Sequence, residues 1–248
     1  NPLYDRVDQP AAMGLLTRLP VVVNADRAMT RGAASAWAYP LVGVVIGVIL
    51  AAFTAVMVWI GMPAGIVAGL VLAVSVIMTG AMHEDGLADT VDGLWGGWDR
   101  ARRLEIMKDS HIGVYGVCAI ALSLLLRWLA LVVVISMGAY WVAFTAVGAL
   151  SRGGMVLLMA MMSNARQDGL SKSVGRPKTT TAWVSVGLAV CMALLVGYPL
   201  LIIVAGVATG ACGLIARAKI GGQTGDILGA TQQVTEIAML LALVVMLT

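Results

Sequence analysis

Residues 37–60 read WAYPLVGVVIGVILAAFTAVMVWI and contain no charged side chain. A helix of about 20 apolar residues crosses the hydrocarbon core of a bilayer, so this run is long enough to span a membrane. Further apolar runs follow at residues 64–82, 114–136, 139–162, 182–197, 199–216 and 233–248. The sequence therefore predicts an all-α integral membrane protein, a polytopic helical bundle of about seven transmembrane helices.

The composition agrees with this fold class. Of the 248 residues, 60% are hydrophobic and 12% are charged, and the mean hydropathy is +0.94. A soluble domain carries about twice that share of charged residues. We therefore expect residues 1–248 to form a single membrane domain. Close helix packing is expected at the small-residue pairs Gly43/Gly47, Gly65/Gly69 and Gly206/Gly210.

Two boundaries stay open in the C-terminal part. Residues 182–216 form either two spans or one hairpin broken at Pro199. The last span begins either near residue 233 or earlier, within the TGDILGATQQ segment at 224–233.

The basic residues predict the topology. Fourteen of the 16 Lys and Arg residues lie outside the apolar runs, and they occur only in alternate connections. Basic residues are retained on the cytoplasmic side of a membrane. We therefore expect the N-terminal segment 1–35 to be cytoplasmic, together with the main loops at residues 83–113, 163–181 and 217–232.

The acidic residues lie in or beside these same connections, so we expect any active site to face the cytoplasm and to take its substrates from there. An active site on the opposite face is excluded, because that face offers no polar segment. The net charge of +3 is small and follows from the topology, so it does not indicate a nucleic-acid partner.

The densest acidic cluster is HEDGLADTVDGLWGG at residues 83–97. Asp85, Asp89 and Asp92 have the spacing i, i+4, i+7, which places them within about 60° on one helix face. Such carboxylates would repel one another, and a hard cation such as Mg²⁺ is their usual partner. The alternative is a solvated acidic loop. Gly86 and Gly93 favour metal binding, because glycines allow a ligand to approach closely.

A second polar segment, GGQTGDILGATQQVTE at residues 221–236, is rich in glycine where a helix begins. Free backbone N–H groups at such a helix start can hold a phosphate. We expect Gln223, Thr224 and Gly225 to contact substrate and Asp226 to add a metal oxygen. The segment is no Walker motif, since no Lys-Ser/Thr follows the glycines.

Four further polar features are candidates for a functional role. Residues 98–113, WDRARRLEIMKDSHIG, predict a short helix with Asp99 as N-cap, which either lies at the membrane interface or binds substrate. His83 could act as a base or bind a phosphate, but a lone His is more often a polar contact. Arg152 is expected to contact phosphate, whereas Arg127, between bulky residues, is expected to pair or to extend toward the interface.

Five motifs taken in order carry a family resemblance. They are LLTRLP at residues 15–20, HEDGLADTVDG at 83–93, RLEIMKDSHIGVYG at 103–116, LSRGG at 150–154 and GGQTGDILGA at 221–230. Together they closely resemble the bacterial cobalamin synthases, also called adenosylcobinamide-GDP ribazoletransferases. One departure is His111, where the family usually has Arg.

The resemblance implies a Mg²⁺-dependent transferase in the bacterial inner membrane, with its active site facing the cytoplasm. Adenosylcobinamide-GDP and α-ribazole, or α-ribazole 5′-phosphate, would be its substrates, and adenosylcobalamin, or its 5′-phosphate, and GMP its products. The partners would be these substrates and the lipid bilayer; a homo-oligomer stays open.

The resemblance also assigns roles to the candidate residues. Asp85, Asp89 and Asp92 would bind Mg²⁺, with Asp226 as a further ligand and Glu84 behind the ligands or acting as a base. Lys108 and Arg152 would hold phosphates. Asp109 and Ser110 would orient substrate.

Two other functions compete with this one. A CDP-alcohol phosphotransferase also uses an Asp-rich membrane helix, but its DGxxAR signature is only partly met by DGLAD at residues 85–89. A transporter for cations or metabolites would place intramembrane acids along a pathway. Against a transporter, the acids lie at one membrane face.

The alternation of basic residues makes a prediction about sidedness. In a chain whose three native cysteines are changed to alanine, Gly175→Cys is expected to react with an impermeant maleimide only from the cytoplasmic face. Gly138→Cys lies in an uncharged turn and is expected to react only from the opposite face. Comparing intact spheroplasts with inverted vesicles measures both, and labelling of position 175 from outside would overturn the predicted orientation.

Overall fold

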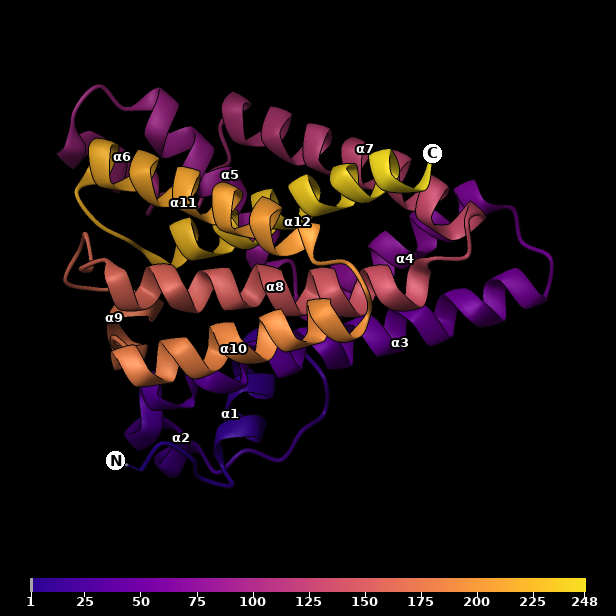
Figure 1. The fold of residues 1–248 in the computed structure, drawn as a ribbon. Coiled ribbons are helices and arrows are strands. Elements are labelled where there is room, and N and C mark those ends of the chain that lie inside the picture. Colours follow the sequence, from indigo (N-terminus) through magenta and orange to yellow (C-terminus); the bar gives the residue numbers. More distant parts are fainter. Residues whose placement is uncertain (1) are drawn as a thin grey trace.

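The structure is a computed structural model that describes residues 2–248, and it is a bundle of helices (Figure 1). No strand occurs among these residues. In chain order the elements are α1 (Asp8–Leu16), α2 (Ala25–Arg31), the 3₁₀ helix η1 (Gly32–Ala38), α3 (Tyr39–Trp59), α4 (Ala64–Thr79), α5 (Met82–Gly96), α6 (Arg100–Ile106), α7 (Val114–Ser136), α8 (Tyr140–Met161), α9 (Leu170–Val174), α10 (Thr179–Leu195), α11 (Leu200–Ile220) and α12 (Gly225–Leu247).

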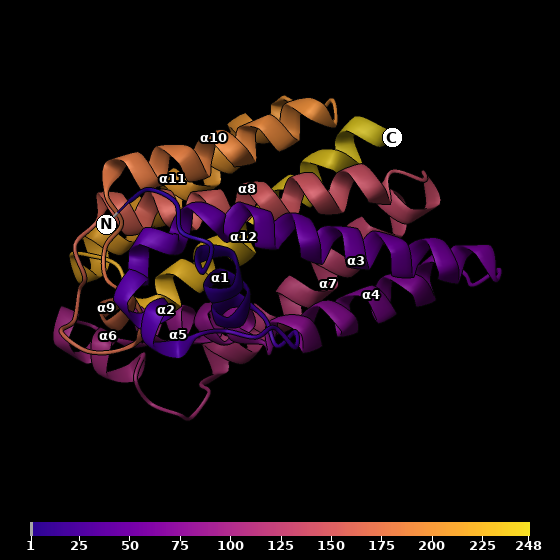
Figure 2. The same ribbon diagram turned by 90° about the horizontal axis from the view of Figure 1, so that it is seen from below.

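Helix α8 is the centre of the bundle. Its apolar window is almost entirely buried, and α3, α10, α11 and α12 all pack against it. Figure 2 shows α3 and α8 between α10 on one side and α4 with α5 on the other. The remaining long helices are about half buried or less, so their outer faces carry exposed apolar side chains suited to lipid.

The polytopic helical class is confirmed, but the count of seven spans is not. Within residues 2–248, five helical segments are long and apolar enough to cross a membrane: 25–59, α7, α8, α11 and α12. Helices α4 and α5 add a sixth span only if they are taken together, and they meet at an 88° bend. Helix α10 has 17 residues and is shorter than a usual span.

Of the two open boundaries, only the second is settled. Helices α10 and α11 are separate helices that flank a turn at residues 196–199, which fits both two spans and a hairpin broken at Pro199. Helix α12 begins at Gly225, so the last helix starts within the 224–233 segment.

The connections sort to opposite ends of the bundle. Helices α6 and α9 and the N-terminal segment lie at one end, and the turns at residues 60–63 and 137–139 lie at the other (Figure 1). The basic connections are therefore gathered at one end, as their alternation along the chain predicts.

Helices α3 and α8 are in backbone contact through glycine. A Cβ atom on Gly43 would overlap the carbonyl oxygen of Gly148, and one on Gly47 would overlap the carbonyl group of Phe144. The prediction of close packing is confirmed for this pair of glycines. It is wrong for Gly206 and Gly210, because an added Cβ there would meet no described atom within 4 Å.

A corner joins α4 to α5. Gly80 and Ala81 both have left-handed backbone angles, with φ of 64° and 57°, and such angles are costly for alanine. The backbone N–H of Arg18 donates to the carbonyl oxygen of Met78 at 2.7 Å. The Arg18 side chain packs where a Cβ on Gly80 would lie. The LLTRLP segment therefore packs against this corner and supports it.

The α3–α8 contact makes a prediction about stability. Gly43→Ala is expected to lower the free energy of unfolding by about 1–3 kcal/mol or more, because the added methyl group meets backbone that cannot move away. Gly206→Ala is the matched control and is expected to be neutral or slightly stabilising. Thermal unfolding in detergent measures both variants, and equal stability of the two would contradict the contact.

Candidate functional site

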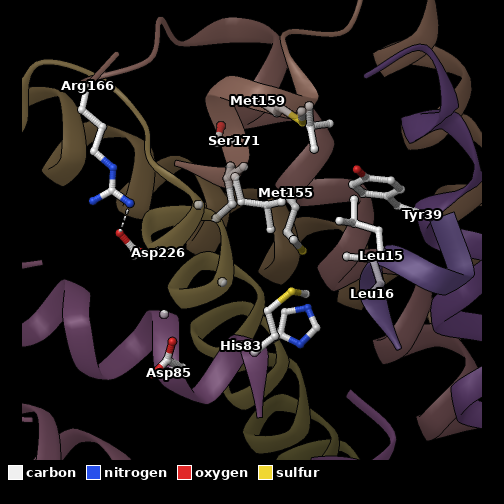
Figure 3. A pocket seen from close by; sticks show the side chains of 17 residues that line it. Leu15, Leu16, Tyr39, His83, Asp85, Met155, Met159, Arg166, Ser171 and Asp226 are labelled. Carbon is white, nitrogen blue, oxygen red and sulfur yellow. Dashed lines mark ion pairs between the residues drawn. The ribbon is translucent and has the colours of Figure 1, made fainter. Parts of the chain in front are cut away.

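A cavity of about 260 Å³ opens where α1, α3, α5, α8, α9 and α12 meet. Figure 3 shows that its lining has two halves. Asp85, Asp226 and Arg166 lie on the polar side, whereas Leu15, Leu16, Tyr39, Met155 and Met159 form the apolar side. His83 lies between the two.

A close crossing of α5 and α12 brings Asp85 and Asp226 to this cavity. A Cβ on Gly86 would lie 2.9 Å from the carbonyl oxygen of Asp226 and 3.3 Å from the Cα of Gly229. Gly86 therefore allows α12 to cross closely, and because it also lines the cavity, its expected role in admitting a ligand stays a prediction. Gly93 likewise packs against α6, where a Cβ would overlap Met107.

Three carboxylates lie near one another at this crossing. Asp89 lies close enough to Asp85 and Asp226 for their charges to repel it. Among residues 2–248, no group of three or more His, Cys, Asp or Glu side chains forms a preformed metal site. The metal roles of Asp85, Asp89 and Asp226 stay predictions.

Asp92 has a structural partner. Its two carboxylate oxygens accept the backbone N–H groups of Gly113, at 2.7 Å, and Gly116, at 2.9 Å. These N–H groups belong to the start of α7, where a helix has unpaired donors and favours a negative charge. Asp92 therefore ties the end of α5 to the start of α7, and its predicted metal role is not tested.

Arg166 links the cavity to the neighbouring loops. Its Nη2 lies 3.2 Å from an oxygen of Asp226, and its Nε lies 3.5 Å from Asp168. Its Nη1 is shielded from solvent and has no partner among the described residues. Lys108 forms an ion pair with Asp168. The hydrogen bond from Lys108 lowers the pKa of the Asp168 carboxyl, since it favours the charged form.

The glycine-rich segment before α12 is fixed by hydrogen bonds. The backbone N–H of Gln223 donates to Ser163 and its carbonyl accepts from Ala165, while its buried side chain accepts from the Ser171 hydroxyl at 2.7 Å. Thr224 is the N-cap of α12. Of the predicted substrate residues here, Gly225 lines the cavity, whereas Gln223 and Thr224 hold the loop in place.

The segment after α6 lies outside the cavity lining. Asp109, Ser110 and His111 are exposed, and the His111 Nδ1 lies 2.7 Å from Asp109. That contact lowers the pKa of the Asp109 carboxyl. Helix α6 begins at the predicted N-cap, Asp99, and its exposed Arg102–Glu105 ion pair matches the interfacial interpretation.

Arg127 is the hub of a buried polar network. It is 1% exposed and lies 3.0 Å from Glu84 of α5 and 3.2 Å from Glu236 of α12. Gln233 donates to Glu84, and Gln232 donates to Glu236. The prediction that Arg127 pairs is confirmed, and its partner Glu84 is directed into the bundle.

Arg152 is 3% exposed and is not among the residues that line the cavity. Its Nη1 donates to the carbonyl oxygen of Gly148 at 3.2 Å, and it lines a separate space of about 50 Å³ together with Glu236. The charges of Glu84 and Glu236 act on it. The predicted phosphate contact of Arg152 stays a prediction.

Sequence reasoning missed several residues of the site. Arg166 was visible only as one of the basic residues that mark the topology, and the apolar side of the cavity only as parts of apolar runs. The RQDG stretch at 166–169, a basic residue beside an acidic one in a polar loop, was the one available signal.

Comparisons with known proteins agree with the sequence motifs. A sequence model of the cobalamin-5-phosphate synthase family matches residues 9–244. The adenosylcobinamide-GDP ribazoletransferase of Bradyrhizobium diazoefficiens is 40% identical over 94% of this chain and 92% of its own. The enzyme of the same name from Mesorhizobium japonicum is 42% identical over 94% of this chain and 91% of its own. The one from Rhizobium johnstonii is 39% identical over 96% of each chain. No solved structure matches the chain.

The network around Arg127 makes a prediction. Arg127→Leu leaves the buried Glu84 and the partly buried Glu236 without this cation, so we expect a loss of about 3–5 kcal/mol in stability. Glu236→Gln keeps a hydrogen-bonding partner and the pair with Glu84, and it is expected to cost less. The midpoints of thermal unfolding in detergent show which of the two variants is less stable. An unchanged midpoint for Arg127→Leu would contradict a stabilising role of the network.

Proposed function

Because the chain belongs to the cobalamin-5-phosphate synthase family, we propose that it transfers the adenosylcobinamide-phosphate group of adenosylcobinamide-GDP to α-ribazole or its 5′-phosphate. A bond forms between the ribose 3′-oxygen and the phosphorus that bears cobinamide. The bond from that phosphorus to the bridging oxygen breaks, and GMP leaves with that oxygen. The hydroxyl proton passes to a base. The products are adenosylcobalamin, or its 5′-phosphate, and GMP.

The observation that carries this proposal is the cavity with Asp85, Asp226 and Arg166 on one side. Displacement at a diphosphate needs cations near the phosphate oxygens and a correctly placed hydroxyl, because positioning and electrostatics supply most of the catalysis. The unpartnered Nη1 of Arg166 is suited to a phosphate oxygen. Lys108, held beside it through Asp168, adds a second positive charge.

Asp85 and Asp226 fit a Mg²⁺ ion, with Asp89 beside them. Their charges repel one another, and a divalent cation would relieve that repulsion. Mg²⁺ in phosphoryl-transfer sites is commonly held by one or two carboxylates and completed by substrate phosphates. When bound, Mg²⁺ would neutralise the diphosphate charge and lower the cost of releasing GMP.

The remaining residues position this site. Glu84 turns inward to Arg127, so it supports α5 behind the carboxylates. Asp92 fixes the other end of that helix. Asp109 and Ser110 lie on the exposed segment next to Lys108, where they would meet a substrate entering from solvent. With the basic connections at the same end, the site faces the cytoplasm of a bacterial inner membrane.

The proposal predicts which carboxylates are essential. Asp85→Asn and Asp226→Asn each remove a charge without changing size, so we expect turnover to fall by about 100-fold or more. GMP release from adenosylcobinamide-GDP, α-ribazole and Mg²⁺ measures this. Raising the Mg²⁺ concentration is expected to restore part of the activity.

Glu105→Gln on exposed α6 is the control and is expected to keep wild-type turnover. Full activity of both Asp variants would remove the metal site from the proposal. Failure of the wild-type protein to release GMP would reject the function itself.

A further inference from the structure

The apolar half of the cavity has no role in diphosphate chemistry. Leu15 and Leu16 from α1, Tyr39 from α3, and Met155 and Met159 from α8 line it, and Figure 3 shows them facing the polar half. We call these five residues the apolar wall. Methionine thioethers adapt to flat rings and make favourable sulfur–aromatic contacts. Such a wall fits a planar, weakly polar ring.

His83 lies beside the apolar wall and lacks a partner. It is 1% exposed, and its Nε2 makes no hydrogen bond with any described residue. A neutral imidazole carries one N–H donor, and a buried donor without an acceptor costs free energy. A ligand with a single acceptor at this position would remove that cost.

We propose that the apolar wall receives the benzimidazole ring of α-ribazole, and that His83 Nε2–H donates a hydrogen bond to the ring nitrogen not bonded to ribose. This inference rests on the proposed function, since it names the place of one of the two substrates. His83 is then a substrate-binding residue that recognises the base, and it holds neither the phosphate nor the attacking hydroxyl.

The polar content of the ring distinguishes it from guanine, the other base in the reaction. The dimethylbenzimidazole ring of α-ribazole has one free acceptor and two methyl groups. Guanine carries several donors and acceptors along its edge, and the Tyr39 hydroxyl and His83 can pair with only some of them, so the others would lie against leucine and methionine. The apolar wall with one neighbouring unpartnered imidazole matches the first ring.

The arrangement also orients the nucleophile. When the benzimidazole ring lies against the apolar wall, the attached ribose points toward Asp85 and Asp226, which line the other half of the same cavity. The volume of about 260 Å³ is near the lower end for small-molecule pockets, about 300 Å³. A nucleoside fits this space, whereas the much larger corrin ring stays outside.

A pair of substrates tests the hydrogen bond. The first is α-ribazole, and the second is its indole counterpart, in which a C–H replaces the free ring nitrogen. We expect wild-type kcat/KM to be about tenfold lower for the indole riboside, because the His83 donor is then buried without an acceptor. In His83→Leu the two substrates are expected to react equally well. The ratio does not depend on how much of the sample is folded.

A matched control and a second variant support the test. His111→Leu, on the exposed segment outside the cavity, is expected to keep the tenfold preference. Met159→Ala, in the apolar wall, is expected to reduce the preference for the dimethylated over the unmethylated benzimidazole riboside about threefold. This second variant tests the base site even if His83→Leu does not fold.

The outcomes are distinguishable. Release of GMP by the wild type together with unchanged preferences in both variants would overturn the base site and leave the proposed function standing. A change in KM for adenosylcobinamide-GDP, with none for α-ribazole, would place guanine in the cavity and also overturn the inference. No GMP release by the wild type would reject the proposed function first.

Discussion

The position of α5 depends on a balance of buried charge. Arg127 and Arg152 bring two positive charges into the bundle, and Glu84 and Glu236 bring two negative ones. Inside a low-dielectric interior an uncompensated ion costs several kcal/mol, so the helices that carry these groups are stable only together. Helix α5 has 15 residues and four acidic side chains. Burial of its apolar side chains alone is therefore not enough to keep this helix packed in the bundle.

Further contacts fix the rest of α5. The left-handed pair Gly80 and Ala81 turns the chain by 88° before the helix begins, and Asp92 caps α7 at its far end. The crossing at Gly86 sets the distance to α12. A strained corner persists only where the surrounding structure enforces it. The result is a rigid helix that presents His83 and Asp85 to one cavity.

The sequence predicted the helices well because the requirement for a membrane helix is local. A run of about 20 apolar residues is read directly from the chain, and the start of α6 follows from the N-cap chemistry of Asp99. The start of α12 was left open between two positions, and the structure places it at the earlier one. The bend before α5 lies inside an unbroken predicted run, so hydropathy does not reveal it. The acidic spacing singled out Asp85 and the glycine-rich segment singled out Asp226 as metal ligands; both line the cavity, and the metal role stays a prediction.

The roles that the sequence did not give depend on pairs that are far apart in the chain. Arg127 pairs with Glu84 and Glu236, which lie 43 and 109 residues from it in the chain, so its partners are not visible in the neighbouring sequence. Asp92 has the spacing of a third metal ligand, and only the folded chain shows that it also accepts hydrogen bonds from the start of α7. Arg166 becomes recognisable as a residue of the site only in the folded chain, where Asp226 at the start of α12 lies beside it.

The two-sided cavity follows from where these elements meet. Helices α3 and α8 contribute membrane-type side chains, such as Met155 and Met159, whereas the polar ends of α5 and α12 contribute carboxylates. Only the end of a membrane bundle places these two kinds of surface side by side, because charges are excluded from its middle unless they are paired. A substrate that joins a flat apolar ring to a ribose and a phosphate needs both surfaces within one cavity. The membrane bundle is therefore part of the binding site, since its apolar helices supply the wall that faces the ring.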